Sequence, residues 1–594
     1  MFVFDCETYR NYFLFAAKMI GSDKTVLVEM HNDQLSDPKG RELMRKIMSK
    51  YVSVSFNGNN YDLAIMVAFL QGYTNSQLKD LSDDIILKPD PTWKICKDRK
   101  IYIPKSWDHI DLFEVSPGKA SLKIYGGRLG APKMQDLPIE PDHIISDDNA
   151  QVLRDYCGND LDVTERLHQS LIKQIDLRVE MSKEYGMDLR SKSDAQIAET
   201  VIKSEYKKVT GDTAYKPDIS LDEFYYKPPA FVKYRSKYMQ DILQHIIDTP
   251  FEIGGNGAVQ LPQWLKKERI MLDDVPYQMG IGGLHSCEKK QLVLAGDKIL
   301  CDMDVASYYP NIILEQQLAP PSMGKHFIDV YQSIVKRRIA AKRAGDKVTA
   351  DTLKICVNGS FGKLGSKYSA LYAPELLIQT TVTGQLALLM LIERMVDAGI
   401  KVVSANTDGI VLHCDKDLEG EMEQVAFDWM MDTTFELERT DYKCLASRDV
   451  NNYVAVKTNG SHKGKGVFAG TGLMKNPDMP IIPKAVSLYH AHGTAIEDTI
   501  KGCDDILQFC SIRRVNGGGQ WQGEYLGKAV RFYWSSEFDE DVCIQYVKNT
   551  NKVPKSAGCR PLMDIKEVTD IDFDRYIEAA NKLLEETGYA RKTR

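Results

Sequence analysis

Residues 300–314 read LCDMDVASYYPNIIL, and the other informative segments of the chain can be arranged around Asp304. A short apolar run places Asp304 at the end of an expected strand, and Pro310 turns the chain soon afterwards. On its own, an Asp that opens a turn after a strand is ordinary turn chemistry. Two later segments make a functional role for Asp304 the better interpretation.

The second segment, residues 401–412, reads KVVSANTDGIVL. Its two apolar runs are separated by a short turn, which predicts a β-hairpin with Asp408 at its tip. Asp-Gly is also a common hairpin turn with no chemical role. Two carboxylates on adjacent strand ends can, however, hold a pair of divalent metal ions. One ion would activate an attacking oxygen and the other would stabilise the leaving oxygen of a phosphoryl transfer.

The third segment, residues 354–362, reads KICVNGSFG and lies in a helical context. Lys354, Asn358 and Phe361 have the spacing i, i+4, i+7, so they share one helix face. A cation, an amide and a flat ring on one face suit a nucleoside triphosphate, with charge for the phosphates and a ring to stack on the base.

DVASYYP, KICVNGSFG and NTDG, in this order, resemble motifs A, B and C of the family B DNA polymerases, especially the compact phage enzymes. The resemblance implies a mixed α/β and α+β multidomain chain, with an RNase H-like exonuclease domain followed by the palm, fingers and thumb of a right-hand polymerase. It also implies that Asp304, the Val305 carbonyl and Asp408 bind two Mg²⁺ ions, for which Mn²⁺ can substitute, and that Lys354 is catalytic.

The resemblance further implies a deoxynucleotide site. Tyr309, immediately before Pro310, matches the residue that rejects a ribose 2′-hydroxyl. The basic helix of residues 336–343 is expected to pair antiparallel with the helix of Lys354, although charged helix faces are usually just solvated. The residues expected to contact the dNTP are Val305, Ser307, Tyr308, Tyr309, Arg338, Lys342, Lys354, Asn358 and Phe361.

The chain departs from the family pattern at three positions of motifs B and C. Asn406 replaces the first of two aspartates, Phe361 replaces a tyrosine, and Gly359 replaces a serine. The second aspartate and the stacking ring are kept, so we expect the chemistry to survive with altered fidelity. The interval from Asp304 to Lys354 has no room for the insertion of protein-primed phage polymerases, so neither strong strand displacement nor protein priming is expected.

The N-terminal region contains three further acidic segments. Asp5 and Glu7 follow the apolar Phe2–Phe4 run and project from one strand face, which is costly unless positive charge lies between them. Asp62 stands near the start of an expected helix, where a helix cap is the ordinary explanation. Tyr156 and Asp160 share a helix face and would, in isolation, be a surface pair.

Together these segments resemble the DxE, Nx(2-3)(F/Y)D and YxxxD motifs of the proofreading exonucleases fused to family B polymerases. The resemblance implies that Asp5, Glu7, Asp62 and Asp160 hold two Mg²⁺ ions and that Tyr156 orients the attacking water. An active 3′–5′ exonuclease is therefore expected. Asn57 and Phe56 would contact the primer end. Lys133 resembles a lysine near the scissile phosphate, with a solvated loop lysine as the alternative.

Two other segments resemble regions that hold DNA in this family. Residues 280–286, GIGGLHS, resemble the YxGG loop, whose glycines Gly282 and Gly283 would let the backbone approach a phosphate. A tight hairpin is the equal alternative, since Gly280 replaces the tyrosine. Tyr453, Lys463 and Lys465 resemble duplex-binding segments, and exposed hairpin lysines are the alternative there.

The expected domains are an exonuclease (1–187), a connecting segment (188–278), a first palm segment (279–325), fingers (326–368), a second palm segment (369–475) and a thumb (476–594). Within the connecting segment, residues 191–208 predict an amphipathic helix and residues 251–259 a hairpin. The thumb region predicts a helix over 497–513, a Gly-rich turn over 516–519, a strand over 529–534 and a terminal helix over 573–586.

Composition limits the partners and the compartment. The chain has 594 residues and a formal net charge of −7, so DNA binding must depend on local basic patches and on metals. Twelve Cys without paired CxxC spacing indicate reduced thiols and no zinc site. No export signal or membrane span is predicted. We expect a cytoplasmic monomer, in the host cytoplasm if phage-encoded, that binds primer-template DNA and dNTPs and works with phage helicase and single-strand-binding protein.

The sequence leaves two alternatives open. One is an exonuclease whose degenerate polymerase half acts as a DNA clamp, which Asn406 and Phe361 would favour. The other is a non-enzymatic single-strand-binding protein, against which the two separate sets of carboxylates speak.

Overall fold

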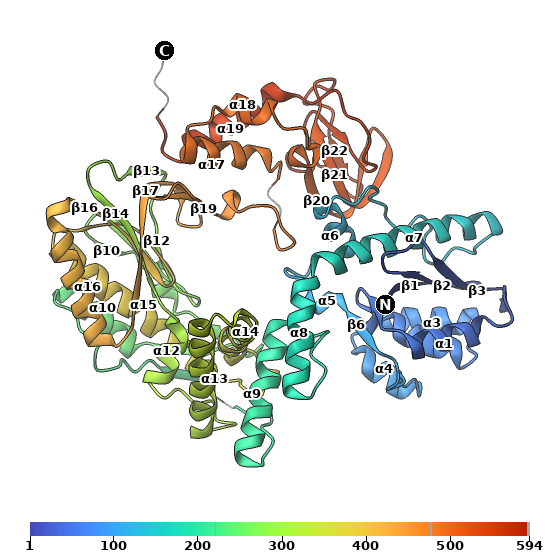
Figure 1. Cartoon of the computed structure of the whole chain (residues 1–594), viewed down its shortest axis with the longest axis horizontal. Coiled ribbons are helices and arrows are strands. Elements are labelled where there is room, and N and C mark those ends of the chain that lie inside the picture. Colours follow the sequence, from blue (N-terminus) through green and yellow to red (C-terminus); the bar gives the residue numbers. More distant parts are fainter. Residues whose placement is uncertain (220, 476–477, 591–594) are drawn as a thin grey trace. The chain divides into compact units, whose positions relative to one another are not determined.

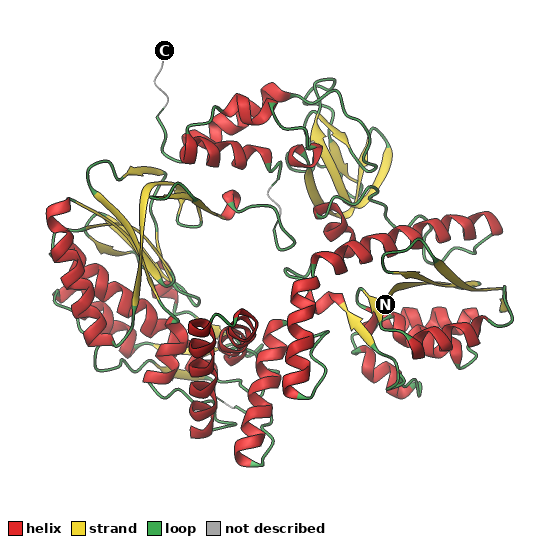
Figure 2. Cartoon of the chain, in the orientation of Figure 1, coloured by secondary structure: helices red, strands yellow, loops and turns green. Residues whose placement is uncertain are grey.

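The structure, a computed structural model, describes residues 1–219, 221–475 and 478–590 and separates into two compact units. Unit 1 comprises Met1–Ser193, Gly470–Ile481 and Gly502–Tyr576, and unit 2 comprises Asp194–Ala469, Ile482–Lys501 and Ile577–Arg594. Both units combine helices with β-sheets (Figure 1, Figure 2). The prediction of a mixed α/β chain with more than one domain is therefore confirmed.

The first sheet of unit 1 has the strand order β4-β3-β2-β1-β5-β6. Its strands are β1 (Phe2–Tyr9), β2 (Tyr12–Met19), β3 (Thr25–His31), β4 (Gln34–Leu35), β5 (Ser53–Ser55) and β6 (His109–Asp111). β1 pairs antiparallel with β2 along its whole length and parallel with β5. Because successive side chains of a strand point to opposite faces, Asp5 and Glu7 leave β1 on the same side as Val3.

Helices cover both faces of this sheet (Figure 1). The helices are α1 (Gly40–Lys50), η1 (Gly58–Asn60), α2 (Asp62–Leu70), α3 (Asn75–Leu87), α4 (Thr92–Asp98), α5 (Leu112–Val115), α6 (Leu122–Arg128), α7 (Asp147–Ser170) and α8 (Ile172–Tyr185). Phe2 and Phe4 pack with residues of α1, α2 and α3, whereas Val3 packs with residues of α7. The carboxylates of β1 therefore face α7.

A second sheet of unit 1, ordered β22-β20-β21-β23, comes from the C-terminal region of the chain. Its strands are β20 (Ser511–Trp521), β21 (Glu524–Trp534), β22 (Ile544–Tyr546) and β23 (Cys559–Pro561), preceded by η4 (Ile506–Phe509). Fully buried Arg531 on β21 donates to the carbonyl oxygens of Leu562 (2.7 Å) and Ala131 (2.9 Å). This guanidinium joins the sheet to the loop after α6.

The sequence prediction is wrong over a stretch of this region. The expected helix over 497–513 ends at Lys501 as α18 (Ile496–Lys501), and residues from Ser511 onward form β20 instead. Pairing with β21 overrides the local helical pattern there. The expected turn over 516–519 lies inside β20, where the register shifts between Arg514 and Gly519. Gly517 and Gly518 adopt φ of +84° and +91°, so these glycines form a bulge.

The main sheet of unit 2 has the order β10-β11-β12-β15-β16-β14-β17-β18-β19, and β13 also pairs with β17. The strands are β10 (Ile270–Leu272), β11 (Val275–Met279), β12 (Leu284–Ser286), β13 (Gln291–Leu294), β14 (Ile299–Val305), β15 (Lys401–Asn406), β16 (Gly409–Cys414), β17 (Leu437–Asp449), β18 (Asn452–Lys457) and β19 (His462–Lys465). The expected strand before Asp304 and the expected hairpin around Asp408 are both confirmed.

One face of this sheet carries a helical layer (Figure 1). The layer contains α10 (Lys237–Asp248), α15 (Pro374–Asp397) and α16 (Glu419–Thr433), whose apolar side chains share one core with the strands. Among the residues that the structure describes, α15 alone is long and apolar enough to cross a membrane, and 78% of its most apolar window is buried. This degree of burial is typical of a helix in the core of a folded domain.

The remaining helices of unit 2 include the expected antiparallel pair, α13 (Lys325–Ala344) and α14 (Lys347–Leu364), which follows α12 (Tyr308–Glu315). The predicted helix of the connecting segment is confirmed as α9 (Asp194–Thr210), and it packs on α14. A Cβ on Gly359 would lie 2.8 Å from Ala198 Cβ and 2.9 Å from the Asp194 carbonyl oxygen. Close packing of α9 therefore favours glycine at position 359.

The other elements of unit 2 are short or lie near its ends. They are β7 (Glu223–Tyr225), β8 (Pro250–Ile253), β9 (Val259–Gln260), α11 (Gln263–Lys267), η2 (Lys416–Leu418), η3 (Gly466–Phe468), α17 (Ile481–His492) and α18, with α19 (Phe573–Glu586) ending in this unit. β8 and β9 pair antiparallel, which confirms the hairpin expected over 251–259. The expected strand over 529–534 lies within β21, and the expected terminal helix is α19.

Near the C-terminus the chain is divided between the two units. Gly502–Tyr576 belongs to unit 1, whereas Ile482–Lys501 and Ile577–Arg594 belong to unit 2. The thumb expected over residues 476–594 stays a prediction. Contacts such as those of Arg531 join sequence segments 400 residues apart, and local pattern carries no information about them.

We expect Arg531→Met to lower the free energy of unfolding of unit 1 by about 2–4 kcal/mol, because it leaves buried carbonyl groups without a donor. Denaturant unfolding followed by fluorescence measures the change. Arg45→Met, on an exposed face of α1, is the matched control and should be nearly neutral. Equal effects of the two substitutions would contradict the structural role of Arg531.

Candidate active sites

Asp304 and Asp408 lie side by side at one edge of the unit 2 sheet. β14 pairs with β16 so that Asp304 stands opposite Gly409, and the Val305 amide donates to the Asp408 carbonyl oxygen at 2.7 Å. A Cβ on residue 409 would overlap Asp304 Oδ1, so a side chain there would displace the Asp304 carboxylate. The turn residue Thr407 has a φ of +60°. The two aspartates predicted to act together are thus brought together.

Both aspartates line one pocket, which also contains residues that sequence reasoning passed over. Asp302, two residues before Asp304 on the same face of β14, is buried and accepts a hydrogen bond from the Tyr442 hydroxyl at 2.6 Å. The predicted DNA-binding residues Tyr453, Lys463 and Lys465 line the same pocket. Asp302 was detectable from its i, i+2 spacing to Asp304.

Burial is the largest influence on the pKa values of the acidic groups in this pocket, and the neighbouring acidic charges add to it. Burial, with the charge of Asp302, raises the pKa of Asp304 to about 6. Burial, with the charge of Asp304, also raises the pKa of Asp408. Lys463 and Lys465 oppose both shifts, and burial together with neighbouring Lys463 lowers the pKa of Lys465. The site thus favours added positive charge.

Residues after Asp304 connect the pocket to the helices. Ser307, with a φ of +49°, accepts a hydrogen bond from Arg338 Nη1 at 3.2 Å, so the basic helix α13 reaches the segment that follows Asp304. Tyr308 is buried and donates to the Gly384 carbonyl oxygen. The Tyr309 ring stacks on Phe361, with ring centroids 4.5 Å apart. Phe361 is therefore fixed to the expected sugar-sensing residue.

The remaining predicted dNTP residues lie on exposed helix faces. Lys354 and Asn358 are exposed on α14, and Phe361 is half-buried on the same face. Lys342 is exposed on the last turn of α13. These four predicted residues thus lie on the α13–α14 pair and are not buried in its core.

The GIGG segment forms the tight hairpin between β11 and β12, one of its two expected alternatives. The Gly280 amide donates to the Gly283 carbonyl oxygen at 3.1 Å. The Gly282 carbonyl oxygen accepts from the Tyr309 hydroxyl, and a Cβ on Gly283 would lie 2.9 Å from Thr407. Gly282 therefore borders Tyr309, and Gly283 borders Thr407.

In unit 1, the four predicted carboxylates converge from three elements. Asp5 and Glu7 lie on β1, Asp62 begins α2 and accepts from the Cys6 amide at 3.1 Å, and Asp160 lies on α7. Cys157, next to Tyr156 on α7, donates to Asp5 Oδ2 at 3.7 Å. Asp62 is thus held by β1 rather than capping its own helix.

A lysine that sequence reasoning missed lies among these carboxylates. Lys123 of α6 donates to the Tyr156 hydroxyl, lies 3.6 Å from Asp160 Oδ2 and stands 4.4 Å from the centre of the Tyr156 ring. Lys133, the lysine named from the sequence, is exposed, and its backbone forms an isolated bridge to Asp564. No sequence pattern around Lys123 distinguishes it from a surface lysine.

Burial raises the pKa of every one of these carboxyl groups. Burial, with the charge of Asp160, raises the pKa of Asp5 to about 7. Burial also raises the pKa of Glu7, Asp62 and Asp160, although Lys123 lowers that of Asp160. One lysine does not balance four acids, so a cation is the ligand that this cluster favours.

Asn57 and Phe56 belong to the loop after β5. Asn57 has a φ of +70°, and its amide donates to Asp111 Oδ1 at 2.8 Å. Phe56 packs edge-on against Phe113 and Tyr125. Asp111, which the sequence did not single out, anchors this loop through the amides of residues 57, 59 and 113.

Among residues 1–219, 221–475 and 478–590, no group of three or more His, Cys, Asp or Glu side chains is arranged to hold a metal ion. The donor chemistry of both clusters nevertheless suits Mg²⁺, which prefers carboxylate oxygens. At nucleotide-processing sites Mg²⁺ takes one or two carboxylates and completes its shell with water and substrate phosphates.

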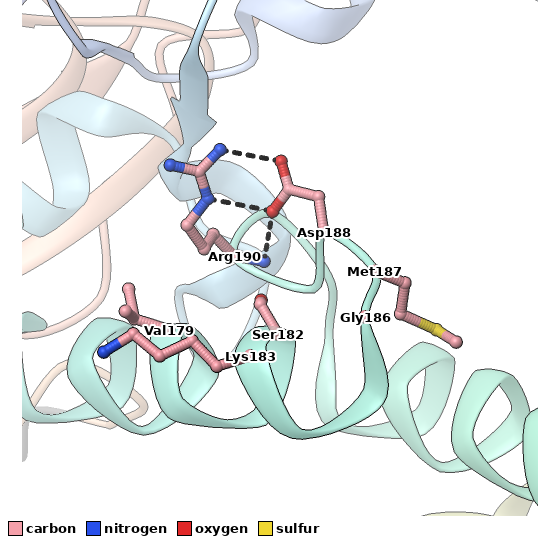
Figure 3. Close-up of a pocket in the computed structure, with 7 residues that line it drawn as sticks. All are labelled: Val179, Ser182, Lys183, Gly186, Met187, Asp188 and Arg190. Carbon is pink, nitrogen blue, oxygen red and sulfur yellow. Dashed lines mark hydrogen bonds and ion pairs between the residues drawn. The ribbon is translucent and has the colours of Figure 1, made fainter.

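A further surface hollow in unit 1 follows α8 (Figure 3). It is lined by Val179, Ser182, Lys183, Gly186, Met187, Asp188 and Arg190. Asp188 and Arg190 point toward each other and form two side-chain hydrogen bonds of 2.9 and 2.8 Å. The hollow contains none of the candidate site residues. Asp188 and Arg190 pair with each other, and Lys183 pairs with Glu180.

No protein-family model and no curated protein sequence matches the chain. Among solved structures, the chain is similar to a family B DNA polymerase from the hyperthermophilic archaeon Pyrobaculum calidifontis. The alignment covers 100% of this chain and 78% of that one, with 14% identity and a TM-score of 0.42. A similarity at this level does not establish a shared fold, so the functional assignment rests on the chain's own residues.

The raised pKa of Asp5 predicts a pH-dependent stability in EDTA. In the folded protein the Asp5 carboxyl group keeps its proton up to about pH 7, whereas the ordinary pKa of an Asp side chain is 3.8. Stability from this group is therefore lost as the pH rises between these values. We expect the melting temperature to fall from pH 5 to 8. Asp5→Asn should reduce the accompanying loss of unfolding free energy by roughly 2 kcal/mol. Identical pH profiles for the two proteins would contradict the shift.

Proposed function

We propose that the protein is a template-directed DNA polymerase of the family B type, with a 3′–5′ exonuclease in its N-terminal region. The observation that carries the proposal is the presence of two separate carboxylate clusters in one chain. Asp304 and Asp408 meet in unit 2, and Asp5, Glu7, Asp62 and Asp160 meet in unit 1. Two acidic sites of this kind suit two phosphoryl-transfer reactions, one building and one degrading the same strand.

In the polymerase reaction, Asp304, the Val305 carbonyl and Asp408 would hold the metal ions. Two Mg²⁺ ions bound there would lower the pKa of the primer 3′-hydroxyl and neutralise charge on the leaving pyrophosphate. Lys354, Arg338 and Lys342 would bind the triphosphate. Arg338 is already held toward the site by Ser307.

The base and sugar of the incoming nucleotide would meet the Tyr309–Phe361 pair. The two rings stack with their centroids 4.5 Å apart, and the charge of Asp408 acts on the Tyr309 hydroxyl. Tyr309 would exclude a 2′-hydroxyl, and Asn358 would contact the nucleotide from the same helix face. Tyr453, Lys463, Lys465, Gly282 and Gly283 would hold the primer-template duplex.

In the exonuclease reaction, the four carboxylates of unit 1 would hold two Mg²⁺ ions, and Tyr156 would orient the attacking water. Lys123, which donates to the Tyr156 hydroxyl, fixes the position of that hydroxyl. Asn57 and Phe56 would contact the frayed primer end, and Lys133 the phosphate backbone.

The alternative function, an exonuclease with a degenerate polymerase half that acts as a DNA clamp, depended on Asn406 and Phe361, and the contacts of these two residues do not favour it. Asn406 Nδ2 donates to the Val450 carbonyl oxygen at 3.0 Å, a bond that an aspartate could not make. Phe361 stacks on Tyr309. Asn406 thus has a structural reason, and Phe361 keeps the stacking ring, so neither departure from the family pattern removes Asp304 or Asp408. The proposed setting is phage genome replication by a cytoplasmic monomer that works with helicase and single-strand-binding protein.

We expect Asp304→Ala or Asp408→Ala to reduce primer extension by roughly 100-fold or more while primer degradation persists. Asp5→Ala combined with Asp62→Ala should have the opposite effect. A labelled primer-template with Mg²⁺, assayed with and without dNTPs, separates the two activities. Asp415→Ala, an exposed carboxylate near the far end of β16 that pairs with Lys298, is the control. Joint loss of both activities in either variant would disprove the two-site assignment.

We expect Tyr309→Val to admit ribonucleotides, because the change removes the ring that would pack under the sugar. Single-nucleotide incorporation with dATP and ATP measures the ratio of the two kcat/KM values, which should move toward unity by at least about tenfold. Tyr215→Val, an exposed tyrosine of unit 2, serves as the control. Unchanged discrimination in Tyr309→Val would remove the proposed role.

A further inference from the structure

Residues 86–105 of unit 1, which read ILKPDPTWKICKDRKIYIPK, form a basic segment in an acidic chain. The segment contains six lysine or arginine residues and two aspartates, a formal net charge of +4, whereas the whole chain carries −7. It runs from the end of α3 through α4 into the following loop. Neither proposed catalytic site uses any residue of this segment.

Large apolar side chains of the 86–105 segment point into solvent. Trp93 is 69% exposed and Tyr102 is 66% exposed. Ile86, Leu87 and Ile103 are also exposed. Several large apolar side chains exposed together in one short segment are typical of an interaction site, whereas single exposed apolar residues are ordinary.

The backbone of this segment is nevertheless anchored. Ile95, Cys96 and Ile101 are buried in the core beneath β1 and β2. The Ile101 amide donates to the Cys96 carbonyl oxygen at 2.8 Å, which fixes the end of α4. Trp93 and Tyr102 are therefore presented from a fixed support, and binding would not have to order them first.

The positive charge of the segment is only partly balanced. Lys88 pairs with Asp84 at 2.7 Å and Lys94 pairs with Asp90 at 2.8 Å. Arg99 also pairs with Asp84. Lys97, Lys100 and Lys105 are exposed and form no ion pair with any residue that the structure describes. Three lysines thus remain available to a polyanion.

We propose that the 86–105 segment is a binding surface for single-stranded nucleic acid. Trp93 and Tyr102 would stack on unpaired bases, and Lys97, Lys100 and Lys105 would contact the phosphates between them. Flat rings interleaved with cations are the combination by which single strands are bound without sequence preference. A duplex hides its bases from such rings. The proposal needs neither catalytic site, so it stands or falls independently of the proposed function.

Quenching of Trp93 fluorescence tests the proposal in the full chain. Trp93 is exposed, whereas Trp107, Trp429 and Trp534 are buried and Trp264 and Trp521 are half-buried. Oligo(dT) of about 12 nucleotides, added in EDTA to prevent degradation, should quench the emission by stacking. A blunt duplex should quench it much less, and Trp93→Phe should remove the signal.

Matched variants then separate stacking from charge. Tyr102→Ala should weaken the binding reported by Trp93 about tenfold, whereas Tyr215→Ala, 74% exposed in unit 2, should not change it. Replacing Lys97, Lys100 and Lys105 by Gln should reduce the slope of log K against log salt by about 2. The control replaces Lys24, Lys46 and Lys50, three exposed lysines of unit 1, by Gln.

Several outcomes would overturn the proposal. If quenching persists in Trp93→Phe, the nucleic acid binds elsewhere. The same conclusion follows if the variant of Lys97, Lys100 and Lys105 shows the same slope of log K against log salt as the control variant. A polyglutamate peptide that quenches Trp93 as strongly as oligo(dT) would identify an acidic protein as the occupant. Anionic lipid vesicles with the same effect would identify a membrane surface.

Discussion

The pairing of β14 with β16 is the constraint on which the candidate polymerase site depends. It brings Asp304, at the end of one strand, next to the turn that carries Asp408, although the two residues are far apart in the sequence. Gly409 makes the approach feasible, because any side chain there would occupy the position of the Asp304 carboxylate. The GIGG hairpin, the Tyr309 ring and the lysines of β19 are then placed around this junction by the same sheet.

Both candidate sites share one electrostatic property. Each gathers buried carboxylates with fewer cations than acids, so the pKa of each carboxyl group rises. Such an arrangement costs stability in the absence of a ligand and is kept where a cation or a proton is used. The positive groups nearby, Lys123 in unit 1 and Lys463 with Lys465 in unit 2, moderate the cost without removing it.

Local signals identified most individual elements correctly. Alternation and turn chemistry located β14, the β15–β16 hairpin and the β8–β9 hairpin, and periodicity located α9, α14 and α19. The prediction was wrong where a distant partner decided the conformation. Residues 511–515 form a strand because β21 pairs with them, and the glycines that follow form a bulge within that strand rather than ending it.

The sequence by itself determined the shared strand face of Asp5 and Glu7 and the shared helix face of Lys354, Asn358 and Phe361, since each depends on spacing along one element. The tertiary structure alone decided that Lys123 reaches Tyr156 and that Gly502–Tyr576 belongs with the first 193 residues. Those outcomes depend on contacts between segments distant in the chain, where burial and pairing override every local preference.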